Sequence, residues 1–258
     1  KRNFLSEDFK VTSWEVLKPH FDNLMERNLD SVKDVKRWFL DRSEIESIIA
    51  EDLAWRYIQM TCYTENEEYR NSYQYFIETI QPEIAPVSDK LNKKVAASPF
   101  LDELSRLEGY DIMIRNLKKE IEIFREENVP LFTEINSESQ KYAHLNGAMT
   151  VEIEGKELTL QQAAVILMST DRARREATYH KITDRRLKDK EALDDLFSTL
   201  VRLRDKVAIN ADFQNFRDYM FKALGRFDYS PQDCYDFHNA IQHEVVPILD
   251  QFSKERKS

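Results

Sequence analysis

The sequence predicts a mostly α-helical protein, made of long antiparallel helices with one small β-hairpin around residues 149–160. Three observations indicate this fold class. Only four of the 258 residues are glycine, charged residues make up 33% of the chain, and apolar residues recur at helical spacing along most of it. The hairpin segment replaces that spacing with an alternating pattern. At roughly 100 to 200 residues per domain, the chain holds one or two domains.

Residues 1–99 are predicted to form an N-terminal helical hairpin region. Thr12 and Glu15 have the spacing of a capping box, so the first helix is expected to begin there. The second helical pattern ends near Cys62, and the third continues to Val95. The aromatic residues at this spacing are expected to lie in the core. Two prolines inside the third pattern are expected to kink it: Pro82 and Pro86.

Residues 100–183 are predicted to form a second helical domain, which carries the hairpin. The two strands flank the segment Glu154-Gly155-Lys156, where glycine suits a tight turn. A capping box then returns the chain to helix, with Thr159 as the N-cap residue and Gln162 at N3. Further helices of this domain are expected over these residues: 100–107, 112–124, 129–147 and 171–182.

Residues 184–258 are predicted to form a third helical region. Two helices are expected over residues 184–209 and 216–224, and the second of them ends at a glycine. The last helix has Ser230 as the N-cap residue and Pro231 at N1, which together favour a helix start. Its apolar stripe is expected to face a buried core, and its members are Cys234, Phe237, Ile241, Val245, Ile248 and Phe252.

The acidic balance of the chain limits its partners. A formal net charge of −9 and a pI of about 5.3 argue against a nucleic-acid binder. The basic stretch over residues 171–190 is interspersed with acids, so it is interpreted as a salt-bridged, solvated face. No apolar run has the length of a membrane span, and no membrane partner is expected. Cys62 and Cys234 lie in apolar helical patterns and are interpreted as structural, in a reducing, cytoplasmic location.

The segment HEVVP, residues 243–247, stops one residue short of the H-E-x-x-H pattern of zinc peptidases. Pro247 stands where the second histidine would be, and it lacks the N–H that would bond the carbonyl of residue 243. His243 lies roughly 200° around the helix from Ile241, so it is expected to point away from the apolar stripe and into solvent. His238 is roughly 140° from His243, so the two cannot share one ion. No metal site is predicted here.

A second candidate metal pair is formed by Glu176 and His180, which share one helical face at positions i and i+4. Carboxylate and histidine ligands from several helices can build a di-metal bundle. The alternative, which the charged surroundings favour, is an ordinary pair on a helix surface. The chain also lacks G-x-S-x-G, Walker and G-x-G-x-x-G motifs. No catalytic residue, cofactor-binding residue or metal ligand is therefore predicted in it.

Two blocks of the sequence carry a family resemblance, residues 100–167 and residues 203–230. Their most specific pieces are Arg204, the triplet Arg217-Asp218-Tyr219 and the hairpin segment Thr150–Leu160. Together with the tryptophan-bearing helices that precede them, these blocks resemble the N-terminal half of the oligoendopeptidase F-like zinc metallopeptidases, relatives of thimet oligopeptidase. The resemblance covers essentially the whole chain.

The resemblance implies an activity whose chemical groups lie elsewhere. In that family, an H-E-x-x-H helix and a later glutamate hold one zinc ion, and the glutamate of the motif acts as the general base. No H-E-x-x-H occurs in this chain, so the resemblance implies that residues 184–258 are the first, truncated helices of the catalytic domain. Residues 100–183 correspond to the N-terminal-type helical domain of the family. Asp212-Phe213 stands where the family usually has Gly-Phe, which is a small departure.

Three functional hypotheses follow. In the first, the chain is the N-terminal portion of a zinc-dependent oligoendopeptidase that hydrolyses short peptides. It then forms one wall of the peptide channel, has the missing C-terminal half as its partner, holds no zinc itself and is inactive alone. In the second, the chain is a non-enzymatic helical scaffold that binds a partner through the surface where the catalytic half would dock. In the third, it is a di-metal bundle that uses Glu176 and His180.

The hairpin has two interpretations of its own. A free strand edge can pair with the backbone of an extended peptide, which makes the segment Met149–Leu160 a candidate substrate contact. The alternative, which is favoured on general grounds, is a small sheet that covers the core. A chain that lacks its packing partner is also expected to expose a large apolar patch and to self-associate.

Overall fold

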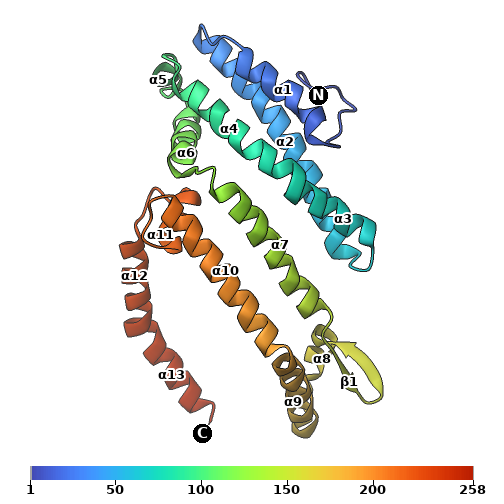
Figure 1. Ribbon diagram of the computed structural model, residues 1–258. Helices are drawn as coiled ribbons and strands as arrows, with labels where there is room; N and C mark the ends of the chain where they lie inside the picture. The colour runs from blue at the N-terminus through green and yellow to red at the C-terminus, as the bar shows by residue number, and fades with distance from the viewer. Residues whose placement is uncertain (1, 258) are drawn as a thin grey trace.

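The computed structural model describes residues 2–257 and shows an elongated, curved molecule made almost entirely of helices (Figure 1). The predicted fold class, mostly α with one small hairpin, is confirmed. The elements in chain order are α1 (Trp14–Glu26), α2 (Val32–Cys62), α3 (Glu67–Tyr75), η1 (Phe76–Ile80), α4 (Gln81–Ala96), α5 (Leu101–Leu104), α6 (Tyr110–Ile123), α7 (Asn128–Gly147), β1 (Thr150–Ile153), β2 (Lys156–Thr159), α8 (Leu160–Ile166), α9 (Arg172–Lys188), α10 (Lys190–Asn210), α11 (Phe216–Ala223), α12 (Pro231–Ala240), η2 (Ile241–Val245) and α13 (Val246–Glu255).

The first hydrophobic core lies between α1, α2, η1 and α4 at the N-terminal end of the molecule. Its largest side chain, Trp38 of α2, is fully buried and donates its indole N–H to the carbonyl of Leu24 at 2.9 Å. Phe21 of α1 and Phe76 of η1 are buried in the same cluster. Burying a side chain of this size stabilises the fold by roughly 1.5–3 kcal/mol. The prediction that the aromatic residues of this region form a core is confirmed for these three.

Two smaller cores lie farther along the molecule. One is formed by α7, α10 and α11, where Leu131 packs against the buried face of α10 around Val207. Asn128 is also buried there, and its side-chain amide donates to the carbonyl of Val207 at 3.0 Å. The other core lies under the hairpin, where Val151 packs with Ile182 of α9. The chain is therefore stabilised by a series of local cores along its length.

A proline occupies the same place after each of the two π-helical turns. Pro82 follows η1 by two residues, and Pro247 follows η2 by two residues. A proline inside a helix lacks its N–H, and its ring crowds the carbonyl four residues earlier, which lies within the π turn in both cases. The π turn lengthens the hydrogen bonds to i→i+5, as when Gln81 N–H donates to the carbonyl of Phe76. The kink predicted near Pro82 therefore takes the form of a π turn.

The hairpin turn is one residue shorter than predicted. Ile153 pairs with Lys156, so only Glu154 and Gly155 lie in the turn. Both have positive φ, 54° and 74°, which a two-residue type I′ turn requires. The capping box that follows is confirmed, because the Thr159 hydroxyl accepts from Gln162 N–H while the Gln162 side chain accepts from Thr159 N–H.

Three predicted helix boundaries are wrong. The N-cap residue of α1 is Ser13 and makes no side-chain capping bond, so the capping box expected at Thr12 does not form. The break predicted near residue 183 lies inside α9, and the two helices part at Asp189 instead. The helix α9 continues through residue 183, and its Ile182 packs in the core under the hairpin. The helix predicted over residues 100–107 is limited to α5, because turns follow Leu104.

Several apolar side chains predicted to be buried are exposed. Trp55 and Ile58 of α2 are both exposed, at 56% and 43%. Cys62 at the end of the same helix is exposed as well, which contradicts its interpretation as a buried structural residue, whereas Cys234 is half-buried. Helical spacing predicts an apolar stripe, but it does not say how much of a long helix is covered by its neighbours.

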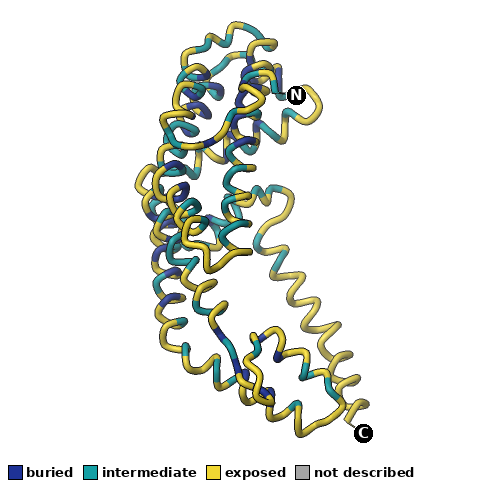
Figure 2. The backbone as a smooth tube through the Cα atoms, turned by 90° about the vertical axis from the view of Figure 1, so that its right-hand side faces the viewer, coloured by how far each residue is buried: buried dark blue, intermediate teal, exposed yellow. Residues whose placement is uncertain are grey.

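The helices form a curved body from which the C-terminal segment departs as a separate arm (Figure 2). The arm consists of α12, η2 and α13 and runs back toward the end of the molecule that holds the hairpin. Among residues 2–257, no helix combines the length and apolar character needed to cross a lipid bilayer.

Candidate functional site

The arm carries the largest group of exposed apolar side chains on one connected segment of the molecule. None of the described residues in α12, η2 and α13 is buried. This contradicts the expectation that the apolar stripe of the last helix faces a core. The exposed members, here called the arm face, are Phe237, Ile241, Val245, Val246, Ile248, Leu249 and Phe252.

The arm is held to the body at its N-terminal end. The predicted helix start is confirmed, since the Ser230 hydroxyl accepts from Asp233 N–H and the Asp233 carboxylate accepts from Ser230 N–H. Hydrogen bonds from the Ser230 side chain and backbone lower the pKa of Asp233. The Arg217 guanidinium of α11 hydrogen-bonds to the hydroxyl of Tyr235 on α12 and pairs with the Asp218 carboxylate at 2.8 Å. These contacts join the helices at the base of the arm.

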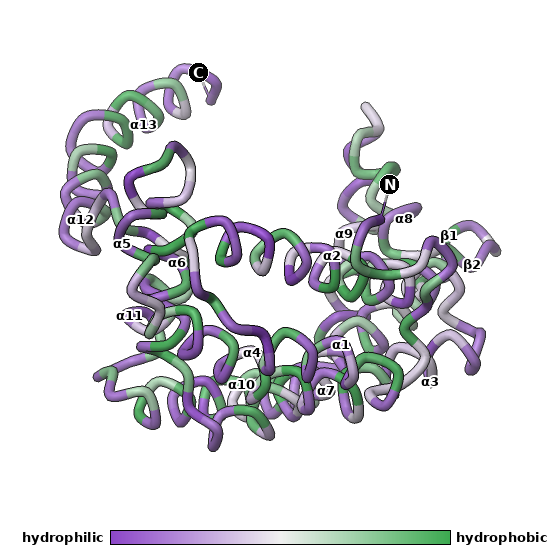
Figure 3. The backbone as a smooth tube through the Cα atoms, turned by 90° about the horizontal axis from the view of Figure 1, so that it is seen from above, coloured by the Kyte–Doolittle hydropathy of each residue, from purple (hydrophilic) through white to green (hydrophobic). Residues whose placement is uncertain are grey.

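An isolated amphipathic helix is a weak structure in water. Most helical stability in proteins comes from packing of the apolar face, and short helices without such packing are marginal. The arm face presents Phe237 at 64% exposure and Phe252 at 51%. In Figure 3, hydrophobic residues are coloured green along α13, which lies on the opposite side of that view from α8 and α9. A group of exposed apolar side chains of this size on one segment is typical of an interaction site, so the arm face is the candidate functional site.

The HEVVP segment lies within the arm, at the π turn and the first residues of α13. His243 is exposed, as predicted, and so is Glu244. His238 lies on α12 and packs its ring against Phe237 at 6.4 Å between centroids. In the part of the chain that the structure describes, no group of three or more His, Cys, Asp or Glu side chains is placed to hold a metal ion.

The second candidate pair lies on the outer surface of α9. Glu176 and His180 are both exposed, and the His180 ring packs edge-on against its neighbour Tyr179 at 5.7 Å between centroids. The basic stretch that contains them is mostly exposed, as predicted for a solvated face. Arg174 on the same helix pairs with the Glu154 carboxylate of the hairpin at 2.9 Å. These contacts are those of an ordinary charged helix surface.

The hairpin covers one of the local cores. Val151 and Ile153 of β1 point into the cluster beneath it, where they meet Ile182. Lys181 donates from its ammonium group to the carbonyl of Glu152 at 2.7 Å, so one backbone acceptor of β1 is already occupied. Pairing of this hairpin with an extended peptide stays a prediction, whereas its role as a cover over the core is observed.

Two models of one peptidase family match most of the chain. The peptidase M3 N-terminal domain matches residues 4–124, and the model of peptidase family M3 matches residues 165–258. The chain therefore belongs to peptidase family M3. A search of curated proteins gave no significant match.

Solved structures of three proteins share the fold over nearly the whole chain, each with a TM-score of 0.89. A candidate oligoendopeptidase F solved at 3.1 Å is 21% identical over 99% of this chain and 45% of its own. A candidate oligoendopeptidase F from Bacillus anthracis str. Ames is 22% identical over 99% and 47%. PZ peptidase A, solved with an inhibitor, is 20% identical over 98% and 45%. The chain thus spans less than half the length of these structures.

The exposure of the arm face was not predicted, because its apolar stripe has the same sequence pattern as the stripe of a buried helix. Sequence periodicity identifies which residues share a face, but not what covers that face.

Proposed function

We propose that this chain is the N-terminal portion of a zinc-dependent oligoendopeptidase that hydrolyses short peptides, and that it forms one wall of the peptide-binding channel. Membership of peptidase family M3 supports the reaction class. The fold shared with oligoendopeptidase F structures more than twice as long supports the role of a portion. The observation that carries the proposal is the combination of this family match with the uncovered arm face.

The residues of this chain do not fit a zinc site. His243 and Glu244 are exposed on the arm, and no described cluster supplies the three converging protein ligands that a catalytic zinc ion needs. The proposal therefore assigns no catalytic step to any residue here. The zinc ion, its ligands and the general base belong to the remainder of the parent polypeptide.

The proposed partner of the arm face is that remainder. A stable protein interface buries roughly 800 Å² on each partner, with an apolar centre. The arm supplies two phenylalanines and five branched aliphatic residues along one segment, which suits the packing of further helices of the same domain. The opposing walls of a channel would then be this curved body and the part of the polypeptide that docks against the arm.

The proposal is tested by comparing the 258-residue chain with the product of its full reading frame. The full product is expected to bind one zinc ion and to cleave a fluorogenic short peptide in a chelator-sensitive manner. The 258-residue chain is expected to bind no stoichiometric zinc and to release no product. If the short chain binds zinc in a one-to-one ratio and shows chelator-sensitive hydrolysis, the proposal that the catalytic groups lie outside this chain is contradicted.

The DNA sequence that follows codon 258 separates the proposal from the non-enzymatic scaffold. DNA that continues past codon 258 and encodes an H-E-x-x-H motif supports the peptidase. A stop codon soon after codon 258 supports a scaffold that uses the arm face for a separate partner. Adding the separately expressed remainder to the short chain should restore hydrolysis if the arm face is the docking surface.

A further inference from the structure

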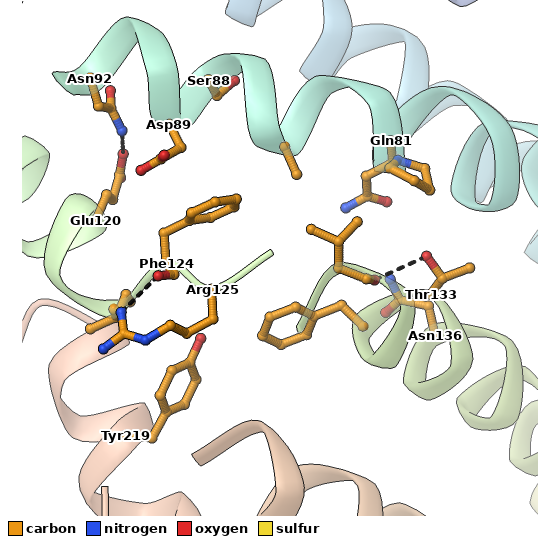
Figure 4. Close-up of a pocket in the computed structure, with 15 residues that line it drawn as sticks. Gln81, Ser88, Asp89, Asn92, Glu120, Phe124, Arg125, Thr133, Asn136 and Tyr219 are labelled. Carbon is orange, nitrogen blue, oxygen red and sulfur yellow. Dashed lines mark hydrogen bonds between the residues drawn. The ribbon is translucent and has the colours of Figure 1, made fainter. Parts of the chain in front are cut away.

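A pocket of about 300 Å³ lies in the body, away from the arm, between α4, the junction of α6 with α7, and α11 (Figure 4). This volume is at the lower end of the range for small-molecule sites. Its walls are mainly apolar and aromatic, with Phe124, Phe132 and Tyr219 around the space. Tyr219 comes from α11 and points its hydroxyl toward the pocket, and burial raises the pKa of that hydroxyl.

Two buried oxygen atoms in this pocket have no hydrogen-bond partner among the described residues. They are Gln81 Oε1 and Asp89 Oδ1, and both side chains extend from α4 toward the pocket (Figure 4). The Asp89 side chain is only 7% exposed, and its other oxygen, Oδ2, accepts from the Lys93 ammonium at 2.6 Å. A buried acceptor without a donor costs about 1–3 kcal/mol, more for a charged group. None of the described residues donates a hydrogen bond to either atom.

Several other polar groups that line the pocket already have partners. Asn92 accepts from the Arg42 guanidinium at 2.6 Å and donates to the Glu120 carboxylate at 3.2 Å. The Arg125 guanidinium donates to the carbonyl of Phe124 at 2.7 Å. It also pairs with the Asp212 carboxylate at 2.6 Å. The two buried lining atoms that lack a partner are thus both acceptors, and each would be satisfied by a hydrogen-bond donor.

The two orphan acceptors are separated along one helix. Gln81 and Asp89 are eight residues apart on α4, which corresponds to about 12 Å at 1.5 Å per residue. One compact ion cannot reach both of them. The acceptor at the Asp89 end is a carboxylate oxygen, which favours a positively charged donor, whereas the acceptor at the Gln81 end is a neutral amide oxygen. The apolar walls between them suit a chain of methylene groups.

We propose that this pocket binds an elongated organic cation, an aliphatic diamine or polyamine, with one ammonium group at Asp89 Oδ1 and a second N–H donor at Gln81 Oε1. The aromatic rings of Phe124, Phe132 and Tyr219 pack against the methylene chain and favour the nearby positive charge. The charged side chains of the lining are Asp89, Glu120 and Arg125, and Lys93 pairs with the other oxygen of Asp89. No residue of the arm lines this site, and its binding can be tested on the 258-residue chain without any peptidase activity.

Titration calorimetry on the 258-residue chain tests the proposal with 1,8-diaminooctane, spermidine and n-octylamine. The two polyfunctional amines are expected to bind one-to-one and at least tenfold more tightly than n-octylamine, which has a single ammonium group on an equally apolar chain. 1,4-Diaminobutane, which is too short to reach both acceptors, is expected to bind no better than n-octylamine. Equal affinity of the long diamine and the monoamine, or no saturable binding by either, would overturn the proposal.

Three variants on α4 complete the test. Asp89→Asn removes the charge at nearly constant volume and is expected to weaken 1,8-diaminooctane binding at least tenfold. Gln81→Met removes the second acceptor and is expected to reduce the preference for the diamine over n-octylamine. Glu83→Gln, a change of charge on the same helix outside the pocket lining, is the matched control and should bind like the unaltered chain.

Each variant is first checked for native helicity and melting temperature. If Asp89→Asn does not fold, the diamine-to-monoamine affinity ratio of Gln81→Met alone tests whether the pocket binds the diamine as proposed. Unchanged diamine binding in either folded variant contradicts the assignment of its oxygen as a ligand contact.

Discussion

At the scale of single residues, polar side chains join segments that are distant in the sequence. The Glu44 carboxylate of α2 accepts hydrogen bonds from the backbone N–H groups of Asn3, Phe4 and Leu5, at 2.9, 2.9 and 2.7 Å. Burial tends to raise the pKa of Glu44, but these three backbone donors outweigh it, so the pKa is lowered. One carboxylate therefore holds the N-terminal segment against the first core.

Replacing Glu44 by alanine should release that segment. Hydrogen bonds to a charged group contribute about 1.5–3 kcal/mol, so Glu44→Ala is expected to lower the free energy of unfolding by about 2 kcal/mol. Urea denaturation followed by circular dichroism measures the change. Glu51→Ala, an exposed acid on the same helix, is the control and should shift the free energy by less than about 0.5 kcal/mol. Equal effects of the two variants would show that the three hydrogen bonds contribute nothing.

His20 of α1 should make stability depend on pH. Its ring packs edge-on against Phe4 and Phe9, at 5.7 and 5.0 Å between centroids, and burial lowers its pKa. The unfolded chain, with an ordinary histidine pKa near 6.5, therefore takes up the proton first as the pH falls. The free energy of unfolding is expected to be constant above about pH 6.5 and to decrease as the pH drops below it.

The pH dependence of His20 is measured by urea denaturation at pH 7.5, 6.5 and 5.5. His20→Gln should remove the part of the decrease that lies in this window, and His144→Gln, at an exposed position on α7, should leave it unchanged. The Glu44 carboxylate does not interfere, because its lowered pKa puts its titration below the window. A decrease of the same size in His20→Gln and in the unaltered chain would contradict this origin.

At the scale of secondary-structure elements, backbone conformation decides where glycine and proline are accepted. The π turns before Pro82 and Pro247 allow each proline to sit in a long helix. In the hairpin, Glu154 takes a positive φ although it is not glycine, as the first position of a type I′ turn requires, and its side chain pairs with Arg174 of α9.

Two glycine substitutions separate conformational strain from packing. Gly155 has φ +74° and Gly147 lies at the end of α7, and an added Cβ meets no atom within 4 Å at either position. Gly155→Ala is expected to destabilise the fold by about 1 kcal/mol, because a side chain disfavours positive φ. Gly147→Ala is expected to stabilise it by up to about 1 kcal/mol through helix propensity. Thermal unfolding measures both, and opposite signs are the expected outcome.

At the scale of the whole molecule, the arm is an element without a covering layer. The first core encloses fully buried side chains, whereas the arm face leaves seven apolar side chains at the surface. Without its packing partner, the arm should drive association of one copy of the chain with another. The same property makes it the proposed docking surface for the remainder of the parent polypeptide.

Sedimentation velocity tests whether the arm face causes self-association of the chain. The 258-residue chain is expected to self-associate increasingly with concentration, and the double variant Ile248→Glu, Phe252→Glu is expected to stay monomeric at the same concentrations. Met168→Glu, which alters the most exposed large apolar side chain outside the arm, is the control and should associate like the unaltered chain. A chain that stays monomeric at several hundred micromolar would count against the proposal that the arm lacks a partner.

Much of the fold follows from local patterns in the sequence. The ends of α2, the capping box of Thr159 and the start of α12 at Ser230 were predictable, because each depends on residues only a few positions apart. His243 is exposed as predicted, but so is the apolar stripe of the same segment, so periodicity alone did not decide its exposure. The family resemblance added the reaction class, which no spacing of residues in this chain indicates.

Tertiary structure alone decided the rest. The arm face has the sequence pattern of a buried stripe, and only the arrangement of the helices leaves it open. The pocket between α4, α6, α7 and α11 joins residues that are more than a hundred positions apart, and its orphan oxygens, Gln81 Oε1 and Asp89 Oδ1, appear only when those helices pack. Hydrogen bonding within a helix is local, so sequence determines it; burial depends on what lies across the helix, which a local pattern does not contain.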